Sequence, residues 1–304
     1  MRICVFGAGS LGSAIGGLLS SKHELTLVGR DPHIAAITNS GLRIMGGRDI
    51  SVHLDARTAL GDISQPDLLI MAVKAYDTES AIAICRSVIG EDTMVLTLQN
   101  GMGNLEALRS WKGAKAFGGS TTMGAMLESP GTVRLSGLGR TVIGSDIDPD
   151  GARKIADALS QSGIPTTTNE NVIEEIWSKA IVSASINPLT AVLRISNGAL
   201  LDSDVISRLM DEVCSECVAI SNAAGIPLPH GSLIERVHRV AMGTSSNRSS
   251  MLRDVEMGRR TEISQITGIM CKYASSLAVP APLNRTLLAM VESLAVVRGE
   301  RLIS

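Results

Sequence analysis

Aromatic side chains are scarce in this sequence: two Phe, two Trp and two Tyr make up 2% of 304 residues. Hydrophobic residues nevertheless reach 44%, so the interior has to be built from aliphatic side chains and methionine. A chain of this length exceeds one typical hydrophobic core and suits two domains.

Cysteine is also sparse, and its spacing argues against a disulfide framework. The five cysteines are odd in number and scattered along the chain. Cys214 and Cys217 form a C-x-x-C pair inside a helical pattern, with no second pair to complete a zinc site. We therefore predict two cysteines packed in a helix, with a redox or metal motif as the alternative. Since the five histidines are dispersed and no carboxylate cluster stands out, we expect no metal.

Neither a basic excess nor a long apolar run is present. The net charge is −2 and the pI is about 6.2, so we expect no nucleic-acid partner and no attraction to anionic membranes. No stretch reaches the ~18 uninterrupted apolar residues of a membrane helix. The short apolar run at residues 1–6 leads into a Gly-rich turn and is typical of a first strand rather than of a signal peptide. We expect a cytoplasmic protein.

The first half of the chain alternates apolar runs with helical patterns. The runs end near Gly7, Gly29, Lys74 and Asn100, and such runs are typical of parallel strands buried on both faces. The alternation predicts an α/β fold, with an N-terminal Rossmann-type doubly wound domain. Between Gly118 and Gly144 we expect short antiparallel strands at the sheet edge, and then a helix over 150–163 and a strand over 165–169.

The second half has helical patterns throughout. Four long helical segments are predicted, and Gly and Pro mark their ends. The segments are residues 171–193, 203–225, 250–278 and 284–300. We expect a Rossmann domain over residues 1–168 and an all-α C-terminal domain for substrate and dimerisation over 169–304, joined by a tight hinge near residue 168.

A G-x-G-x-x-G motif lies at the extreme N-terminus, after a predicted strand and before a predicted helix. The first glycine permits the tight turn, the second lets a pyrophosphate approach the backbone, and the third lets the helix pack on the strand. The alternative is a Gly-rich turn without a ligand. The residues predicted to contact the dinucleotide are Gly7, Ala8, Gly9, Ser10, Leu11 and Gly12.

Cofactor type is indicated by the end of the second strand. NAD enzymes usually place an acid there for the ribose hydroxyls, whereas an Arg favours the 2′-phosphate of NADP. Arg30 occupies that place and Asp31 follows it. We favour NADPH, while a solvated Arg30 and an Asp31 that binds ribose are the alternatives.

Polar residues also follow the next two strands. Lys74 and Asn100 end consecutive apolar runs, and ligands of open α/β sheets lie at the carboxyl ends of strands. We expect both side chains beside the nicotinamide. A surface lysine and a turn-forming asparagine are the alternatives.

The first helical segment of the second domain carries a polar stripe. Lys179, Ser183 and Asn187 are spaced i, i+4, i+8 on one face of an otherwise apolar pattern. A solvated face is the usual explanation. The near absence of other charges indicates a buried helix whose stripe faces a site, where Lys179 is a plausible proton donor.

Several motifs together resemble the ketopantoate reductase family over nearly the whole chain. They are GAGSLG at the N-terminus, VKAYDT at Lys74, QNGMGN at Asn100, WSKAIVSASINPLTAVL at Lys179, SNG at Asn197, and NRSSMLRDVEMGRRTEI, which includes Asn247, Ser250 and Glu262. The resemblance implies NADPH-dependent reduction of 2-dehydropantoate to (R)-pantoate, on the route to pantothenate and coenzyme A.

The resemblance also implies residue roles. Lys179 is then the general acid, and Glu262 orients substrate and lysine. Asn100 lies between nicotinamide and substrate, and Lys74 lines the same cleft. The other substrate positions implied are Ser183, Asn187, Asn197, Asn247 and Ser250, with Ser250 at the carboxylate. On local sequence alone, Ser250 is also a candidate helix N-cap.

One departure concerns Ser183, where the family often has Asn. Serine keeps a donor and an acceptor but is shorter, so a direct contact can become water-mediated. This leaves a different branched 2-keto acid as an alternative substrate. A separate alternative is a non-catalytic NADP(H)-binding redox sensor. For assembly, we expect a homodimer formed through the C-terminal helices.

Overall fold

Two compact units make up the chain. The computed structural model describes residues 1–61 and 63–297. Unit 1 comprises Met1–Gln99 and Asn104–Glu175, and unit 2 comprises Asn100–Gly103 and Ile176 onward. The division after Glu175 lies beyond the hinge expected near residue 168, because the first turn of the following helix is bonded to unit 1: the Ser120 hydroxyl donates to Glu175 Oε1 at 3.2 Å.

The core of unit 1 is an eight-stranded sheet whose strand order reverses at its centre. β2 lies on one side of β1 and β6 on the other, so the topological switch point is at β1. All neighbours pair in parallel except β11 with β8. The predicted apolar runs thus form the parallel strands. The spatial order is β12 (Thr166–Thr168), β11 (Thr141–Gly144), β8 (Ala116–Thr121), β7 (Met94–Thr97), β6 (Leu68–Met71), β1 (Arg2–Phe6), β2 (Glu24–Val28) and β5 (Asp55–Arg57).

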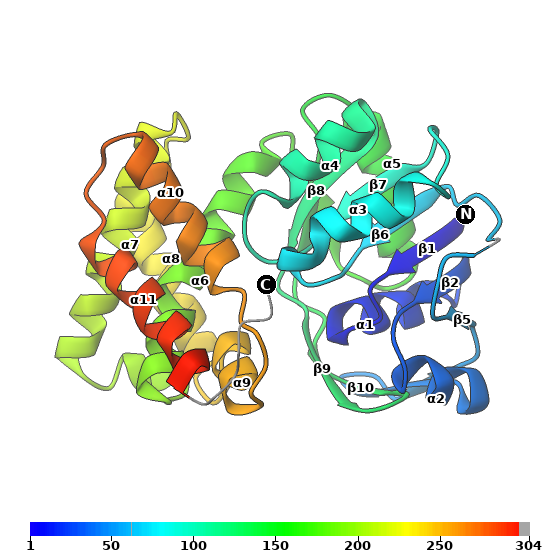
Figure 1. The fold of residues 1–304 in the computed structure, drawn as a ribbon, viewed down its shortest axis with the longest axis horizontal. Helices are drawn as coiled ribbons and strands as arrows, with labels where there is room; N and C mark the ends of the chain where they lie inside the picture. Colours follow the sequence, from blue (N-terminus) through cyan, green and yellow to red (C-terminus); the bar gives the residue numbers. More distant parts are fainter. Residues whose placement is uncertain (62, 298–304) are drawn as a thin grey trace. The chain divides into compact units, whose positions relative to one another are not determined.

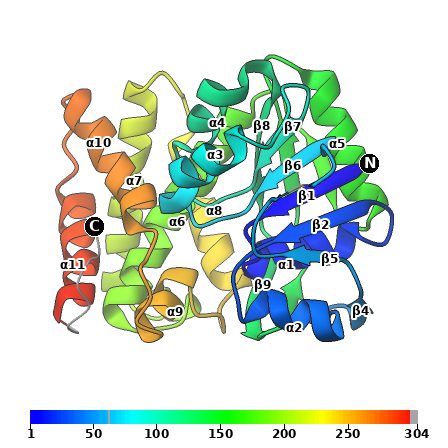
Figure 2. The ribbon, with the colours of Figure 1, turned by 45° about the vertical axis from the view of Figure 1, so that its right-hand side comes forward.

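Helices cover both faces of this sheet (Figures 1 and 2). Side chains of β1 alternate between the faces, since Ile3 and Val5 join the large core cluster while Cys4 lies near Cys85 of the opposite helix layer. Burial, together with the neighbouring Cys85, raises the pKa of the Cys4 thiol to about 12. The helices of unit 1 are α1 (Ser10–Leu19), α2 (His33–Ser40), α3 (Thr78–Arg86), α4 (Asn104–Lys112) and α5 (Pro149–Gln161).

A second, four-stranded sheet corrects the expectation for residues 118–144. Only β11 extends the main sheet as an antiparallel strand, whereas β9 and β10 form a separate sheet with β3 and β4. Every residue of α1 from Gly12 to Leu19 is buried, so this helix needs cover on the side away from the main sheet. The second sheet provides it in the order β4 (Ile50–Val52), β3 (Leu42–Gly46), β10 (Thr132–Gly137) and β9 (Gly124–Ser129).

Unit 2 is helical, as predicted, but its segments differ from the prediction in two places. Helix α8 was not predicted, although its Leu233, Val237 and Ala241 recur at helical spacing and are buried. The single segment expected over 250–278 is broken after α9, where Gly258 has a φ of 64°, and continues through a π-helical turn. The elements are α6 (Val172–Leu193), α7 (Asp204–Ala223), α8 (His230–Gly243), α9 (Ser250–Glu256), the π turn (Ser264–Gly268), α10 (Ile269–Ser276) and α11 (Pro282–Val297). The end of the fourth predicted segment, residues 298–300, lies outside the described residues.

Helix α6 is long and apolar enough to cross a membrane by length and composition. Its most apolar window has a mean hydropathy of 1.2, and 67% of that window is buried inside the protein. The core helix of a water-soluble domain meets the same criteria, so packing accounts for the apolar character of α6.

A buried polar cluster fastens α11 to α7. Glu216 accepts from the backbone N–H groups of Leu283 at 2.9 Å and Asn284 at 3.0 Å, and from Asn284 Nδ2 at 2.8 Å. The carboxylate thereby satisfies amides at the start of α11, which an N-terminal helix end leaves without partners. Cys217 donates to Asn284 Oδ1 at 3.3 Å. Cys214 and Cys217 are both fully buried in α7, which confirms that they pack as helix cysteines.

We expect Glu216→Ala to lower the free energy of unfolding by about 2–3 kcal/mol, because charged hydrogen bonds are lost and buried amides are left without partners. Urea unfolding followed by circular dichroism measures the change. The matched control is Glu212→Ala, which removes an exposed carboxylate from the same helix and should leave the midpoint nearly unchanged. Equal shifts in the two variants would refute the capping role of Glu216.

Candidate active site

The glycine motif forms a tight turn between β1 and α1. Gly7 has a φ of 116°, and a Cβ placed on it would lie 2.5 Å from the backbone of Ala72 and Val73. A Cβ on Gly12 would lie 2.1 Å from the carbonyl oxygen of Gly7. Gly9 differs, because nothing lies within 4 Å of its Cβ position. Packing therefore requires glycine at 7 and 12, whereas the space at Gly9 is open to a ligand.

The N-terminus of α1 fits the pyrophosphate of a dinucleotide. Its first turn carries no acidic residue. Its N-cap is Gly9, and among the described residues no side chain makes a cap hydrogen bond there. The backbone amides there retain their hydrogen-bonding capacity for an anion at the positive end of the helix dipole. Unit 1 thus meets the backbone requirements for a nicotinamide dinucleotide.

At the end of β2, Arg30 and Asp31 have different environments. The Arg30 side chain is 90% exposed and its guanidinium lies 3.4 Å from Asp77, a surface contact of little energetic weight. Asp31 Oδ1 accepts from the Ala35 backbone N–H at 3.1 Å and so serves the start of α2. Of the two residues, Arg30 is the one whose charge is presented outward.

Lys74 lies beside the glycine motif. It follows Val73, whose backbone abuts Gly7, and precedes the 3₁₀ turn Ala75–Asp77. Because Asp77 also contacts Arg30, the ends of β1, β2 and β6 carry the motif, Arg30 and Lys74 on one edge of the sheet. Unit 1 therefore brings together the residues predicted for the cofactor, apart from Asn100.

The second sheet and α2 hold helix α1, which follows the glycine motif, through hydrogen bonds to its serine side chains. Leu127 N–H donates to Ser10 Oγ at 2.9 Å. His33 Nδ1 accepts from the Gly131 backbone N–H at 2.9 Å, so its Nε2–H donates to Ser13 Oγ, also at 2.9 Å. The imidazole is 5% exposed, and this arrangement requires its neutral form. Sequence reasoning did not single out His33.

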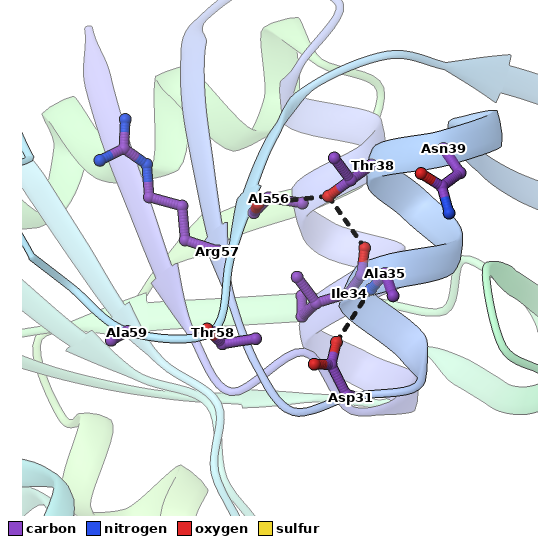
Figure 3. A pocket seen from close by; sticks show the side chains of 9 residues that line it. All are labelled: Asp31, Ile34, Ala35, Thr38, Asn39, Ala56, Arg57, Thr58 and Ala59. Carbon is purple, nitrogen blue, oxygen red and sulfur yellow. Dashed lines mark hydrogen bonds between the residues drawn. The ribbon is translucent and has the colours of Figure 1, made fainter.

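A cleft of about 520 Å³ opens between α2 and the segment that follows β5 (Figure 3). Asp31, Thr38 and Thr58 are among its lining residues; apart from Asp31, the alternative ribose contact, none of the residues predicted for the site lines it. β5 is the edge strand, whereas phosphates in such sheets bind at the switch point. We therefore do not assign this cleft to the reaction.

Unit 2 presents the polar stripe on α6. From Trp177 to Ala191, Lys179, Ser183 and Asn187 are half-buried, and every other residue is buried. The stripe is thus the accessible line on an otherwise enclosed helix, as the sequence predicted. Ser178, a buried neighbour, accepts from Arg236 of α8 at 2.7 Å, which fixes α6 beside Lys179.

The carboxyl end of α6 is linked to the start of α9. The Thr190 hydroxyl donates to Ser249 Oγ at 2.7 Å, and Ser249 Oγ accepts from Leu252 N–H at 3.1 Å. Ser249 is therefore the N-cap of α9, not Ser250 as one alternative had it. Ser250 occupies the first helical position and is exposed. Ser250 therefore follows directly after the residue that contacts Thr190, which lies three positions after Asn187 on α6.

Asn197 and Asn247 lie in two segments that are hydrogen-bonded to each other. The Asn197 N–H donates to the Asn247 carbonyl at 2.9 Å, and Asn197 Nδ2 donates to Thr244 Oγ1 at 2.8 Å. Asn197 is 8% exposed, whereas Asn247 is exposed. The geometry therefore gives Asn197 a part in holding the loop that carries Asn247, whatever it contributes to substrate contact.

Asn100 and Glu262 meet the same element of unit 2. Met102 N–H donates to the Gln265 carbonyl at 3.1 Å, which docks residues 100–103 on the π turn. Glu262, 7% exposed, lies two residues before that turn, and its carbonyl accepts from Gln265 N–H at 3.1 Å. Single π turns recur at functional sites. No sequence signal pointed to Gln265, because it holds residues 100–103 through its backbone carbonyl rather than through its side chain.

Two family models match the chain. The first, Ketopantoate reductase PanE/ApbA, covers residues 3–146, and the second, its C-terminal part, covers residues 171–295. The chain belongs to the ketopantoate reductase PanE/ApbA family. Similar curated relatives include the 2-dehydropantoate 2-reductases of Pyrococcus abyssi, 36% identical over 99% of this chain and 100% of that protein, and Pyrococcus horikoshii, 38% identical over 96% and 97%.

Solved structures of the family share the fold. A ketopantoate reductase from Ralstonia eutropha is 29% identical with a TM-score of 0.92 over 98% of this chain and 100% of that one. A ternary structure of D-mandelate dehydrogenase with NADH and anilino(oxo)acetate is 27% identical with a TM-score of 0.93 over 98% and 99%. The family architecture of an N-terminal Rossmann domain and a helical C-terminal domain is therefore confirmed for this chain.

Protonation of His33 should weaken the hold on α1. Burial lowers the pKa of His33, so the folded protein binds this proton less readily than the unfolded chain, whose imidazole titrates near ~6.5. The stabilisation by His33 is complete above that value and is lost as the pH falls toward the lowered pKa. We expect the melting temperature to fall more between about pH 7.5 and pH 5 in the wild type than in His33→Asn.

Differential scanning fluorimetry across that pH range measures this difference. His33→Asn should itself cost about 1–2 kcal/mol near neutral pH, since one of two hydrogen bonds is lost. The control His53→Asn changes an exposed imidazole and should leave the pH profile as in the wild type. Parallel profiles for the wild type and His33→Asn would contradict the assignment.

Proposed function

We propose that this chain reduces 2-dehydropantoate to (R)-pantoate with NADPH, within pantothenate and coenzyme A biosynthesis. The observation that carries the proposal is the accessible stripe of Lys179, Ser183 and Asn187 on a helix that is otherwise buried over residues 177–191. Named relatives with 36–38% identity over nearly the full chain support the same substrate.

The residues of the chain divide the work of a ketone reduction. The reduced nicotinamide supplies the hydride to the carbonyl carbon. Negative charge then develops on the carbonyl oxygen, and the Lys179 ammonium stabilises that charge and donates the proton. The product is a secondary alcohol, and Lys179 is left neutral until it regains a proton from water. Glu262 orients substrate and lysine.

Substrate binding is assigned to the polar side chains around the stripe. Ser250, exposed at the first position of α9 while Ser249 makes the cap contact, is assigned to the substrate carboxylate. Asn187, Asn247 and Asn100 supply amide donors and acceptors for the hydroxyl and keto groups. These groups bind the substrate, and Lys179 alone donates the proton.

A second candidate is the reduction of another 2-keto acid. It is favoured by Ser183, where the family often has Asn, and by the similarity to D-mandelate dehydrogenase. A shorter side chain at this position leaves room beside the stripe, which a bulkier keto acid would fill. The non-catalytic redox sensor is disfavoured, because binding alone requires neither Lys179 nor Glu262.

Oxidation of NADPH at 340 nm, with a panel of 2-keto acids that includes 2-dehydropantoate and benzoylformate, tests these candidates. We expect the highest kcat/KM with 2-dehydropantoate. A higher value with benzoylformate would favour the second candidate, and binding of NADPH without turnover of any keto acid would favour the sensor.

We further propose that the protein works in the cytoplasm as a homodimer formed by the helical unit. Buried, unpaired cysteines are compatible with a reducing compartment. Large apolar side chains of unit 2 are exposed and suit contact with a second copy; they are Leu193, Val205, Met242, Met257, Leu277 and Met290. Sedimentation velocity should give a mass of two chains, and a monomer would refute this assembly.

Cofactor preference should depend on Arg30. A charge-assisted contact with the 2′-phosphate is worth about 1.5–3 kcal/mol, or about 10- to 100-fold in affinity. We expect Arg30→Ala to raise the KM for NADPH by that factor and to leave the KM for NADH nearly unchanged. The control is Arg43→Ala, another exposed arginine of unit 1 with a surface ion pair. A wild type that prefers NADH, or equal losses with both cofactors, would exclude this role for Arg30.

Lys179 should be required for turnover. General acid catalysis contributes about 10²–10⁴-fold, so Lys179→Ala should lower kcat by at least about a hundredfold and leave NADPH binding and the melting temperature nearly unchanged. Lys179→Met keeps the side-chain stem and should behave alike. Lys272→Met, which alters an exposed lysine of α10, is the matched control. A Lys179 variant that retains more than about a tenth of wild-type kcat would exclude the general-acid role.

A further inference from the structure

A buried hydrogen-bond network lies where β6 and β7 end. Its centre is Gln99, 8% exposed, whose Nε2 donates to the Val73 carbonyl at 2.7 Å and to Thr78 Oγ1 at 2.9 Å. Gln99 Oε1 accepts from the Thr97 hydroxyl at 2.9 Å. Thr78 in turn donates to Asn104 Oδ1 at 2.8 Å. The network thus joins the ends of both strands to the first residues of α3 and α4.

The donors and acceptors admit one orientation of the Gln99 amide. The Val73 carbonyl can only accept, so it must face the NH₂ group. Thr78 Oγ1 accepts a hydrogen bond from the second amide N–H, and its own hydroxyl donates a hydrogen bond to Asn104. The remaining amide oxygen then accepts from Thr97. Because each group has its partner, rotation of Gln99 would leave several buried polar atoms without one, at about 1–3 kcal/mol for each.

Two residues predicted for the site, Lys74 and Asn100, adjoin this network. Val73 precedes Lys74, and Gln99 itself precedes Asn100. The backbone at Ala72 and Val73 is also the surface against which Gly7 closes its turn. A displacement of Val73 would therefore move Lys74 and alter the support of the glycine motif.

We propose that Gln99 is a positioning residue, which acts by holding the Val73–Lys74 backbone against the end of β7. This inference rests on the proposed function, since Lys74 and Asn100 matter through the cofactor and substrate that they meet. Gln99 itself is enclosed by protein groups and acts through its neighbours. A misplacement of ~1 Å at reacting groups can cost about a hundredfold in rate, so the loss of the network should appear in catalysis as well as in stability.

The test compares Gln99→Met with Gln65→Met. Gln65 also bridges two backbone groups, donating to Val88 O at 2.6 Å and accepting from Gly90 N–H at 2.6 Å. Unlike Gln99, it does not adjoin a residue predicted for the site. We expect Gln99→Met to lower kcat about tenfold or more and to raise the Kd for NADPH several-fold. Gln65→Met should keep both constants within about twofold of the wild type, whatever its melting temperature.

Thr97→Val supplies a coupled variant. It removes the hydroxyl that orients the Gln99 amide, so kcat should fall less than in Gln99→Met but in the same direction. The double variant should match Gln99→Met, because residues in one network are not additive. If Gln99→Met does not fold, Gln99→Asn, which shortens the same amide by one methylene, takes its place.

Fluorescence titration of NADPH and stopped-flow turnover give the two constants. Unchanged kcat and Kd in the Gln99 variant, or equal losses in Gln65→Met, would overturn the proposal, and a lower melting temperature alone would show a structural role only. A wild type that binds NADPH but does not reduce 2-dehydropantoate would refute the proposed function. The comparison of Kd values would then still decide whether Gln99 positions the cofactor loops.

Discussion

The close approach of the Gly7 peptide to the backbone of Ala72 and Val73 is the constraint on which the cofactor half of this protein depends. No side chain fits there, since a Cβ would lie 2.5 Å from backbone atoms. The same contact brings Lys74 next to the glycine motif and requires the end of β6 to stay in place. The second sheet, His33 and Gln99 all support this region from different directions, through Ser10, Ser13 and Val73.

In unit 2, helix α6 is the element on which the arrangement of the predicted site residues depends. Between residues 177 and 191 its burial leaves one accessible line, and its buried polar side chains there are satisfied by Arg236, by Ile181 O and by Ser249. Polar groups are costly to bury without partners, so these bonds separate the side chains used for packing from those presented to a ligand. Lys179 belongs to the second group because of its place on the helix, and its ammonium group is the reason for proposing it as the general acid.

Family membership restricts the reaction more than it restricts the substrate. The chain is about as similar in fold to a ketopantoate reductase as to D-mandelate dehydrogenase, with TM-scores of 0.92 and 0.93. A shared fold hosts different substrates through a few side chains in the site. In this chain such side chains are Ser183 on the stripe and Arg30, which stands beside an Asp31 already engaged by α2.

The sequence by itself determined the local features: the glycine turn, the parallel strands, the polar stripe on α6, and, through family resemblance, the residues expected to bind and react. Each depends on contacts over a few residues, which periodicity and steric rules describe. Only the tertiary structure decided that β9 and β10 join β3 and β4, that residues 100–103 dock on the π turn, that Ser249 rather than Ser250 caps α9, and that Gln99 and His33 brace the glycine motif. Most of these contacts join residues far apart in the chain, 98 positions for Gly131 and His33, and the residue that caps α9 is held by Thr190, 59 positions away. Their energies depend on which surfaces remain to be covered once the local elements have formed, and no local pattern encodes that choice.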